Sequence, residues 1–544
     1  MGGIADFLDS LIGGVDRVFF CAAIGSLIWG LLLLKPWSAR YNDKHLSSTV
    51  TLLYFGALGL AITQAFALIV KIWLIRVTLE QWPFPAFAET IQFKGGIVRL
   101  LVFATLAVFT RLRLSAQPTS LTNWRIATGI GLLAVVAGAW LTHGAGRFDY
   151  QAQLMTLTVI HQVSAAAWVG GIFQLLNIWF LHKKQLIEPN WWPHFLKQFS
   201  TLGLAAVVAS ALTGLPMTLH YIDTWNGFLG TGYGNLLMVK LLLLGLALFL
   251  AYLNNRGSRE YSVHNQETAL SREVPNYMQA ETFILISLLF TAVSLSTQPP
   301  AIDIHETTAT WQETLAGFTP RLPRLQSPTH EELMAGEAGR TAIVGQVPSP
   351  ASTTWSDYNH NISGIFVTVI SLMSMLSYVR KTSPGHIPLW PIGFVLLGLF
   401  LFVRSDPEAW PLGPIGFWDS TFNNGEILQH RIATLLAAVL GILEFKARHP
   451  SNTNQKLIYM FPLLAGFGGL MLLTHSHIGF QPKTAFLIQS GHTLMGVFAI
   501  ILASSRWLEI QLHDERQKNL AGFISAAAML QVGMILMFYR EPLY

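Results

Sequence analysis

The side chains most able to do chemistry in this chain are histidines and methionines. Of its 17 histidines, the informative ones lie at or near one end of long apolar segments. Neutral imidazole and thioether sulfur are ligands that suit copper, whereas hard cations prefer carboxylates, which these segments lack. The candidate metal ligands are His143, His161, Met217, His220, His430, His475, His477 and His492.

Two of these histidines lie well inside apolar segments. His161 follows about nine residues of its predicted helix, which places it roughly 13 Å along the helix axis. His492 lies about seven residues into another segment, at 1.5 Å per residue roughly 10 Å. An imidazole at such a depth is costly unless it faces other helices and finds a partner, so each is a candidate functional residue. The less favoured alternative is that each is a structural histidine that only satisfies the packing around it.

The other candidates are placed by short spacings. Met217 and His220 are three residues apart, so a helix puts them on one face. His475 and His477 flank a single residue at a predicted helix end, which gives the short chelate that copper tolerates. His430 lies about one turn into its own segment.

Paired imidazoles on neighbouring helices also suit b-type haem. Such a site needs two histidines at similar depth and small residues that let a porphyrin approach. The run SAAAWVGG follows His161 closely, and Gly491 and Gly496 flank His492. The haem ligands would be His161, His430 and His492. Small residues also allow close helix contact with no cofactor, so copper and haem both stay open.

Composition indicates the elements that must position these side chains. The chain has 544 residues, of which 52% are hydrophobic and 12% charged, with a mean hydropathy of +0.46. An average globular chain carries about twice that share of charge. Apolar runs of about twenty residues recur, each long enough to cross a hydrocarbon core of about 30 Å. We predict an all-α polytopic membrane bundle of about fourteen transmembrane helices, near 16–36, 48–75, 95–112, 124–142, 152–181, 198–219, 233–253, 279–297, 361–380, 387–404, 426–445, 457–474, 485–505 and 519–539.

Charge predicts the orientation of this bundle. The net charge is +5 and the isoelectric point about 9.2, but most basic residues gather in alternate connections, such as the one around Arg111 and Arg113. The positive-inside rule assigns these connections to the cytoplasm and both termini to the periplasmic side of a bacterial inner membrane. The basic charge thus reflects membrane topology and predicts no nucleic-acid partner. The single cysteine, Cys21, excludes an intrachain disulfide.

A polar segment divides the chain into two halves. Residues 299–360 are rich in Pro, Thr, Ser and Glu, which predicts a periplasmic linker between an eight-span domain (1–298) and a six-span domain (361–544). The halves share a local pattern, since residues 131–171 and 462–499 each contain Leu-Thr-His, a short polar loop and a second histidine. We interpret this as a partial repeat.

Several stretches of the first half resemble the copper resistance protein D (CopD) family. They are LTHGAGRFDYQ with VIHQVSAAAWVGGIFQL, LKQFSTLGLAAVVASALTGL, LGTGYGNLLMVKLLLLGLALFLAYLNNR and AETFILISLLFTAVSLSTQPP. The resemblance is best over residues 140–300. It implies a membrane protein of copper homeostasis that receives copper from a periplasmic copper-carrier protein, with His143 and His161 as metal contacts and Lys240 in a structural or counter-charge role.

Three functions follow, in order of preference. The first is an inner-membrane copper transport or copper homeostasis protein that takes copper at periplasmic-side histidines and is not an enzyme. The second is a haem b membrane cytochrome, which would be an oxidoreductase. The third is a membrane assembly or scaffold factor. No nucleotide-binding motif is present in its proper context, so ATP-driven pumping by this chain is not expected.

Overall fold

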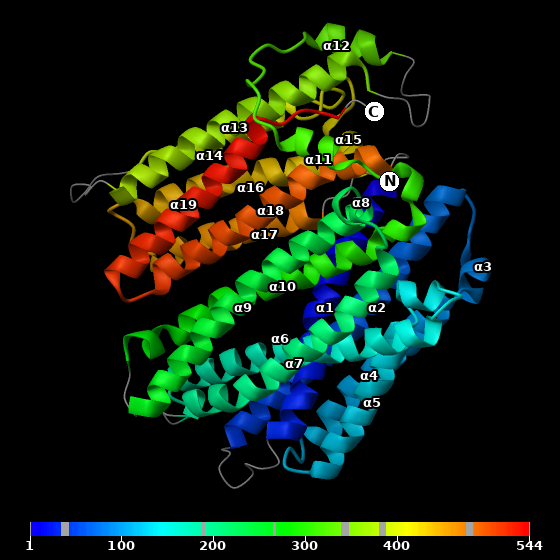
Figure 1. Ribbon diagram of the computed structural model, residues 1–544, viewed down its shortest axis with the longest axis vertical. Helices are drawn as coiled ribbons and strands as arrows, with labels where there is room; N and C mark the ends of the chain where they lie inside the picture. The colour runs from blue at the N-terminus through cyan, green and yellow to red at the C-terminus, as the bar shows by residue number, and fades with distance from the viewer. Residues whose placement is uncertain are drawn as a thin grey trace. The chain divides into compact units, whose positions relative to one another are not determined.

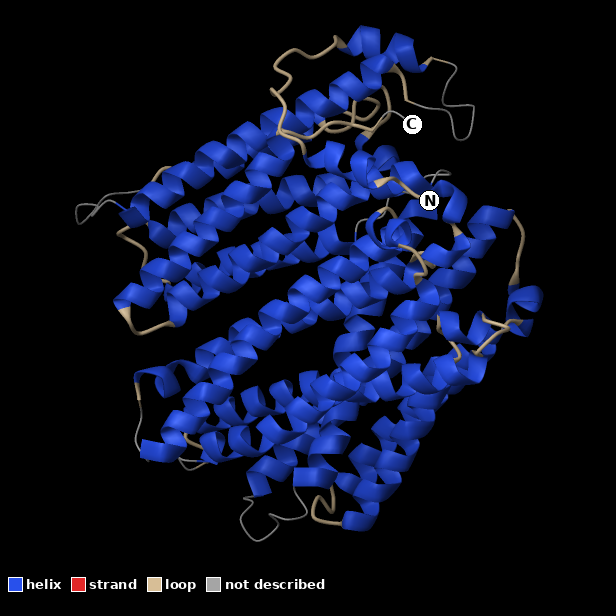
Figure 2. Ribbon diagram, viewed as in Figure 1, coloured by secondary structure: helices blue, strands red, loops and turns tan. Residues whose placement is uncertain are grey.

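All long elements of the described chain are α-helices, and the described residues contain no β-strand (Figure 2). The computed structural model describes the whole chain except residues 1, 34–42, 188–190, 265–267, 339–347, 380–387, 475–481 and 543–544. Within the described part, 12 helices are long and apolar enough to cross a membrane. The protein is therefore an all-α, multi-pass membrane protein, as the sequence predicts.

Each of the predicted membrane segments coincides with a helix (Figure 1). Short helices connect them: α3 (Phe84–Glu89), α8 (Trp225–Leu229), α11 (Trp311–Phe318), α12 (His330–Glu337) and α15 (Phe417–Asn423). The long helices are α1 (Gly2–Leu33), α2 (Asp43–Leu79), α4 (Ile91–Phe109), α5 (Leu121–Ala139), α6 (Gln151–Lys183), α7 (Trp191–Tyr221), α9 (Gly232–His264), α10 (Ala269–Thr297), α13 (Pro350–Val379), α14 (Ile392–Arg404), α16 (Gly425–Arg448), α17 (Met460–Thr474), α18 (Pro482–Gln511) and α19 (Glu515–Met537).

Two of the predicted segments fall short of the length and composition of a clear membrane span. Helix α14 has 13 residues. Helix α4 has 19 residues and contains Lys94 and Arg99. The count of fourteen crossings, and the side on which the termini lie, therefore stay predictions.

The chain forms two compact units. The N-terminal unit comprises Leu8–Tyr221 and Gly245–Ser296, and the C-terminal unit comprises Met1–Phe7, Ile222–Leu244 and Thr297–Tyr544. Helices α1 and α9 contribute to both units. The start of α9 packs within the C-terminal unit, where the Asn235 side-chain amide donates to Thr493 Oγ1 at 2.8 Å. The predicted division into residues 1–298 and 361–544 stays a prediction.

Helix α1 packs closely against several helices of the N-terminal unit, and glycines on α1 or on its neighbours lie at these contacts. A Cβ added to Gly13 would lie 2.7 Å from Val293 of α10, and one added to Gly56 of α2 would lie 2.7 Å from the Ala23 nitrogen. The closest approach is to α6, where a Cβ on Gly170 would lie 2.1 Å from the Cys21 carbonyl oxygen. Small residues that let helix backbones meet in this way are typical of membrane interfaces.

We expect Gly170→Ala to destabilise the protein, since its new methyl group would force α1 and α6 apart. Overpacking of this kind costs about 1–3 kcal/mol. Gly129→Ala in α5 is the matched control, because nothing lies within 4 Å of a Cβ at that position. Thermal unfolding in detergent should show a lower midpoint for Gly170→Ala and an unchanged or higher midpoint for Gly129→Ala. Equal midpoints would contradict this account of the interface.

A buried ion pair links three helices of the same unit. Arg99 of α4 donates to both carboxylate oxygens of Asp16 of α1, at 2.7 and 3.1 Å. The Arg99 guanidinium also donates to Gln64 of α2 at 2.5 Å. Both charged residues are buried, with 6% and 7% of their surface exposed. An isolated charge at this depth would be costly, so the two groups must be paired.

In the C-terminal unit six long helices form a closed series of neighbours. Helix α13 packs against α19, which is followed by α18, α17, α16 and α14, and α14 packs back on α13 (Figure 1). Their shared core includes Ile370, Trp390, Phe461 and Leu502. Such a closed arrangement lets side chains of non-consecutive helices, such as α13 and α18, meet at its ends.

The predicted linker contains local structure. Helices α11 and α12 each begin with a capping box, Thr310 with Glu313 and Thr329 with Glu332. The Lys483 ammonium of α18 donates to Glu313 at 2.6 Å and holds the pKa of that carboxyl below its usual value. The capping boxes and this contact explain how the described part of so polar a segment is held in place.

Helix α13 begins at Pro350, eleven residues before the predicted start of its membrane segment. The Ser349 hydroxyl accepts a hydrogen bond from the Ser352 backbone N–H at 3.1 Å. A serine cap followed by proline is a strong helix start, although the residues that follow are polar. His360 consequently lies inside a helix, whereas the sequence pattern placed it at the edge of the linker.

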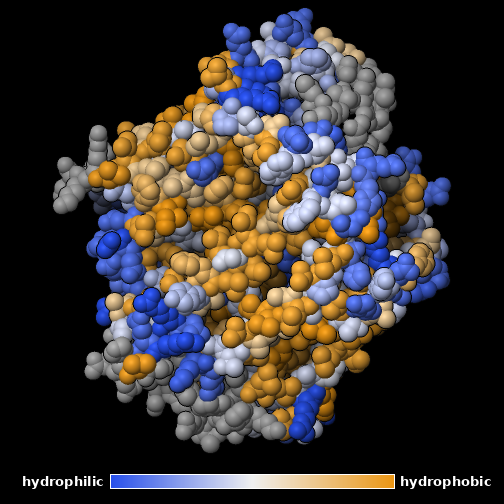
Figure 3. Space-filling view, in the orientation of Figure 1, coloured by the Kyte–Doolittle hydropathy of each residue, from blue (hydrophilic) through white to orange (hydrophobic). Residues whose placement is uncertain are grey.

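The lipid-facing side of the helices is apolar. Helix α7 shows this well, because Leu204, Leu212, Leu215 and Leu219 are each more than 60% exposed and recur at helical spacing. Apolar side chains cover much of the visible face of the molecule, and hydrophilic ones gather over the region of α12 (Figure 3). The opposite side of α7 carries Ser210, Thr213 and Met217, which face α6.

Candidate metal centre

His161 of α6 lies against the polar side of α7. Its Nδ1 atom is 3.1 Å from the Ser210 carbonyl oxygen and 3.0 Å from Thr213 Oγ1. A Cβ added to Gly214 would lie 3.4 Å from the imidazole, so the glycine provides the space for the ring. Helix spacing thus brings Ser210, Thr213 and Gly214 together around one histidine.

These contacts define the tautomer of His161. The Ser210 carbonyl can only accept, and the Thr213 hydroxyl donates to the Ala209 carbonyl at 2.7 Å. The proton of a neutral His161 ring therefore lies on Nδ1, which makes Nε2 the basic nitrogen. A histidine that ligates a metal is commonly held in this way, with the other ring nitrogen donating to a fixed oxygen.

A thioether lies one turn from this histidine. Thr158, three residues before His161 on α6, has its hydroxyl 3.6 Å from Met217 Sδ on α7. His161 and Met217 therefore lie on facing helix surfaces, about 5 Å apart along the helix axis. This is the mixed imidazole and sulfur environment that copper accepts.

His143 begins the short 3-10 helix His143–Gly146 that precedes α6, and His220 lies in the last turn of α7, each beside a tyrosine. The His143 ring is 6.3 Å from the Tyr221 ring, and the His220 ring is 5.0 Å from the Tyr150 ring. His161 lies ten residues after the first residue of α6, about 15 Å along the axis. Each of these histidines thus has its own surroundings, and their predicted role as ligands stays a prediction.

The C-terminal unit brings two histidines together. The rings of His360 on α13 and His492 on α18 have their centres 6.0 Å apart at an angle of 85°. With metal–nitrogen bonds of about 2 Å, two imidazoles that share one ion in a linear arrangement hold their ring centres about 6 Å apart. The observed separation fits a shared ion.

Both rings of this pair are fixed in the same tautomer as His161. His360 Nδ1 lies 2.9 Å from the Ser356 carbonyl oxygen, and His492 Nδ1 lies 2.9 Å from the Ile488 carbonyl oxygen. Carbonyl groups only accept, so both rings carry their proton on Nδ1 in the neutral state. Each Nε2 is then the nitrogen that a metal ion would use.

The C-terminal tail of the chain supports His360. The Tyr539 ring packs on it with a separation of 4.2 Å between ring centres. Asn361 donates to the Tyr539 carbonyl oxygen at 3.0 Å, and the Glu541 backbone N–H donates to Asp357 at 2.7 Å. Burial raises the pKa of the Glu541 carboxyl. The tail thus holds Tyr539 against the histidine pair.

His430 is held by a carboxylate. Its Nδ1 lies 2.7 Å from Asp406 Oδ1, in the loop after α14. Glu408 and Glu426 also act electrostatically on His430. Burial, together with the neighbouring Asp406 and Glu426 carboxylates, raises the pKa of Glu408. A carboxylate–histidine pair is the arrangement that orients many metal-ligating imidazoles.

Within the described residues no three His, Cys, Asp or Glu side chains converge as a metal site. The candidate centres are therefore pairs or single histidines with fixed partners. The predicted ligands His475 and His477 lie outside the described residues.

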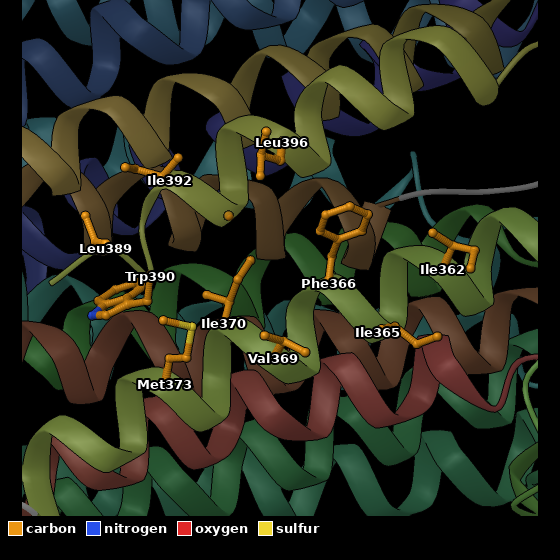
Figure 4. Close-up of a pocket in the computed structure, with 11 residues that line it drawn as sticks. Ile362, Ile365, Phe366, Val369, Ile370, Met373, Leu389, Trp390, Ile392 and Leu396 are labelled. Carbon is orange, nitrogen blue, oxygen red and sulfur yellow. The ribbon is translucent and has the colours of Figure 1, made fainter.

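An apolar groove between α13 and α14 is a separate feature. Its volume is about 490 Å³, and Phe366, Met373 and Trp390 are among its lining residues (Figure 4). The lining contains no imidazole or carboxylate. On a membrane protein such a surface suits acyl chains, and it does not belong to the candidate metal centre.

Comparison with known proteins bears on helices α7 to α10. Residues 193–295 match the family model of copper resistance protein D. This segment of the chain is CopD-like. No curated protein matches the chain.

The CopD-like segment runs from α7 to α10 and includes Ser210, Thr213 and Met217. His161 itself precedes it, but the hydrogen bonds of its ring run to α7. The match gives this membrane protein a copper-related function. No described residue adds support for the haem alternative, which stays a prediction.

Sequence reasoning left His360 out of the ligand set. The residues before it are polar, so hydropathy alone placed the start of the membrane segment at residue 361, just after His360. The Ser349-Pro350 helix start was the available signal, because it places His360 three turns inside a helix. No sequence spacing, however, indicates that α13 meets α18.

Proposed function

We propose that this protein handles copper in a bacterial inner membrane, taking copper ions at histidines near the periplasmic ends of its helices. A periplasmic copper-carrier protein would deliver the ions, and copper is thus the cargo. The CopD-like segment supports the choice of metal. The orientation that places these histidines on the periplasmic side comes from the distribution of basic residues.

One observation carries this proposal. Three predicted ligands, His161, His430 and His492, each have Nδ1 beside an oxygen acceptor, at 3.1, 2.7 and 2.9 Å. Each ring is thereby oriented before any ion arrives, and Nε2 is its basic nitrogen in the neutral form. A buried structural histidine also needs an acceptor for its N–H, and a ligand held in this way gains affinity because less freedom is lost on binding.

The first test measures copper bound to the purified full chain. Wild-type protein in detergent should retain copper through dialysis and show no Soret band in its visible spectrum. A Soret band from stoichiometric haem would support the cytochrome alternative instead. Colourless protein that binds no copper would contradict the copper proposal and favour a scaffold role.

We expect His161→Gln to weaken copper binding in the N-terminal unit by about tenfold or more, the scale seen when a metal's supporting groups are lost. Titration of the reduced protein with Cu(I) in competition with a chelator measures this. His182→Gln is the matched control, since His182 lies on the same helix, 21 residues further on. Equal affinities in the two variants would contradict a ligand role for His161.

A further inference from the structure

Helix α10 contains a carboxyl group that the copper site does not use. The Glu281 side chain is fully buried, with 0% of its surface exposed, in the middle of a membrane span. A carboxylate in such a place is costly unless a cation neutralises it. The groups around Glu281 therefore decide which protonation state it adopts.

The two partners of Glu281 are neutral. Trp168 of α6 donates its indole N–H to Oε1 at 3.3 Å, and the Asn254 amide of α9 donates to Oε2 at 2.7 Å. Trp168 and Asn254 are themselves buried. Two neutral donors replace only part of the hydration that a carboxylate loses, so the protonated acid is the favoured form.

The hydrogen bonds of Glu281 run to neither a charged nor a titratable side chain, although such groups are present on the surrounding helices. His161 is seven residues before Trp168, about 10 Å along α6. Arg256 of α9 is ion-paired with Glu260 at 3.2 Å and is more than half exposed. Further groups on these helices are Lys240, Tyr252 and Arg259 of α9, Arg272, Glu273 and Tyr277 of α10, and Asp16, Arg17 and Cys21 of the neighbouring helix α1.

The contact with Asn254 can persist in both protonation states. Its length of 2.7 Å suits an amide N–H donating to a carboxylate, and also an acid O–H donating to an amide oxygen. Rotation of the Asn254 amide group by half a turn exchanges these two hydrogen bonds. In the present orientation the buried Asn254 Oδ1 has no hydrogen-bond partner, so the amide is not locked in one state.

We propose that Glu281 is a membrane-buried proton-binding site through which the protein links movement of its cargo to movement of protons. The acid form gives one proton to water when water reaches the side chain between the helices. The carboxylate that remains offsets the positive charge of a passing copper ion. No electron is transferred, and the proton is regained from water on the other side. The link to copper rests on the proposed function, whereas the proton site does not.

Infrared spectroscopy of the full chain in lipid nanodiscs tests the proton site. At neutral pH the wild-type protein should show absorption from a protonated carboxyl group that is lost in Glu281→Gln and retained in Glu260→Gln. Glutamine keeps the size of the side chain and an oxygen acceptor, and a thermal melt checks that the variant is folded. Identical carboxyl absorption in wild type and folded Glu281→Gln would overturn the proposal.

Copper uptake into vesicles tests the link. We expect an imposed pH gradient to change the uptake rate of the wild type several-fold and to leave the rate of Glu281→Gln unchanged, with copper binding at equilibrium equal in both. A variant that responds to the gradient as the wild type does would overturn the link. Failure of the proposed function would look different, because the wild type would then bind no copper while the carboxyl absorption persisted.

Discussion

Replacing His360 with glutamine should remove one equivalent of bound copper from the protein. The ring centres of His360 and His492 are 6.0 Å apart, and both rings present Nε2 as the basic nitrogen. A two-ligand site loses half of its ligands with either substitution. We therefore expect His360→Gln and His492→Gln each to lower affinity at this site by about 100-fold or more, equivalent to about 2.7 kcal/mol.

Isothermal or competitive titration with Cu(I) measures this loss in the full chain. His449→Gln is a matched control, since His449 follows the C-terminal end of α16 and its ring is hydrogen-bonded to the Ser451 hydroxyl. The double variant His360→Gln/His492→Gln should lose less affinity than the sum of the two single losses, because both residues act on one site. Additive losses, or full copper occupancy in either single variant, would contradict a shared ion.

Removing one partner of the buried ion pair should produce the largest loss of stability. In Asp16→Asn the Arg99 guanidinium keeps its charge, still 6% exposed, without the carboxylate that it contacts at 2.7 Å. Breaking a buried pair from one side costs about 3–5 kcal/mol, since an uncompensated charge stays behind. The change should appear as a markedly lower midpoint of thermal unfolding in detergent.

The double variant Asp16→Leu/Arg99→Met provides the decisive comparison. Replacing both charges with apolar side chains of similar size is often neutral or stabilising. We expect this variant to recover most of the stability lost in Asp16→Asn. If the double variant is as unstable as the single variant, the loss comes from disturbed packing of α1 and not from an unpaired charge.

The sequence was sufficient to predict the elements of this protein. A chain with 12% charged residues and recurrent apolar runs must bury its backbone polar groups in helices, and every predicted segment is a helix. The resemblance of residues 140–300 to CopD likewise rested on local motifs, and the match at residues 193–295 supports it. Hydropathy and motifs are properties of consecutive residues, which is why the helices and the family resemblance could be predicted from the sequence.

Tertiary structure alone decided which side chains meet. His360 and His492 are 132 residues apart, and their pairing depends on the closed series of helices that brings α13 near α18. The neutral partners of Glu281 come from α6 and α9, and the Asp16–Arg99 pair joins α1 to α4. Contacts between small residues and between buried polar partners, which are spread over the whole chain, determine which helices of a membrane bundle are neighbours. The periodicity within one helix does not indicate its neighbours.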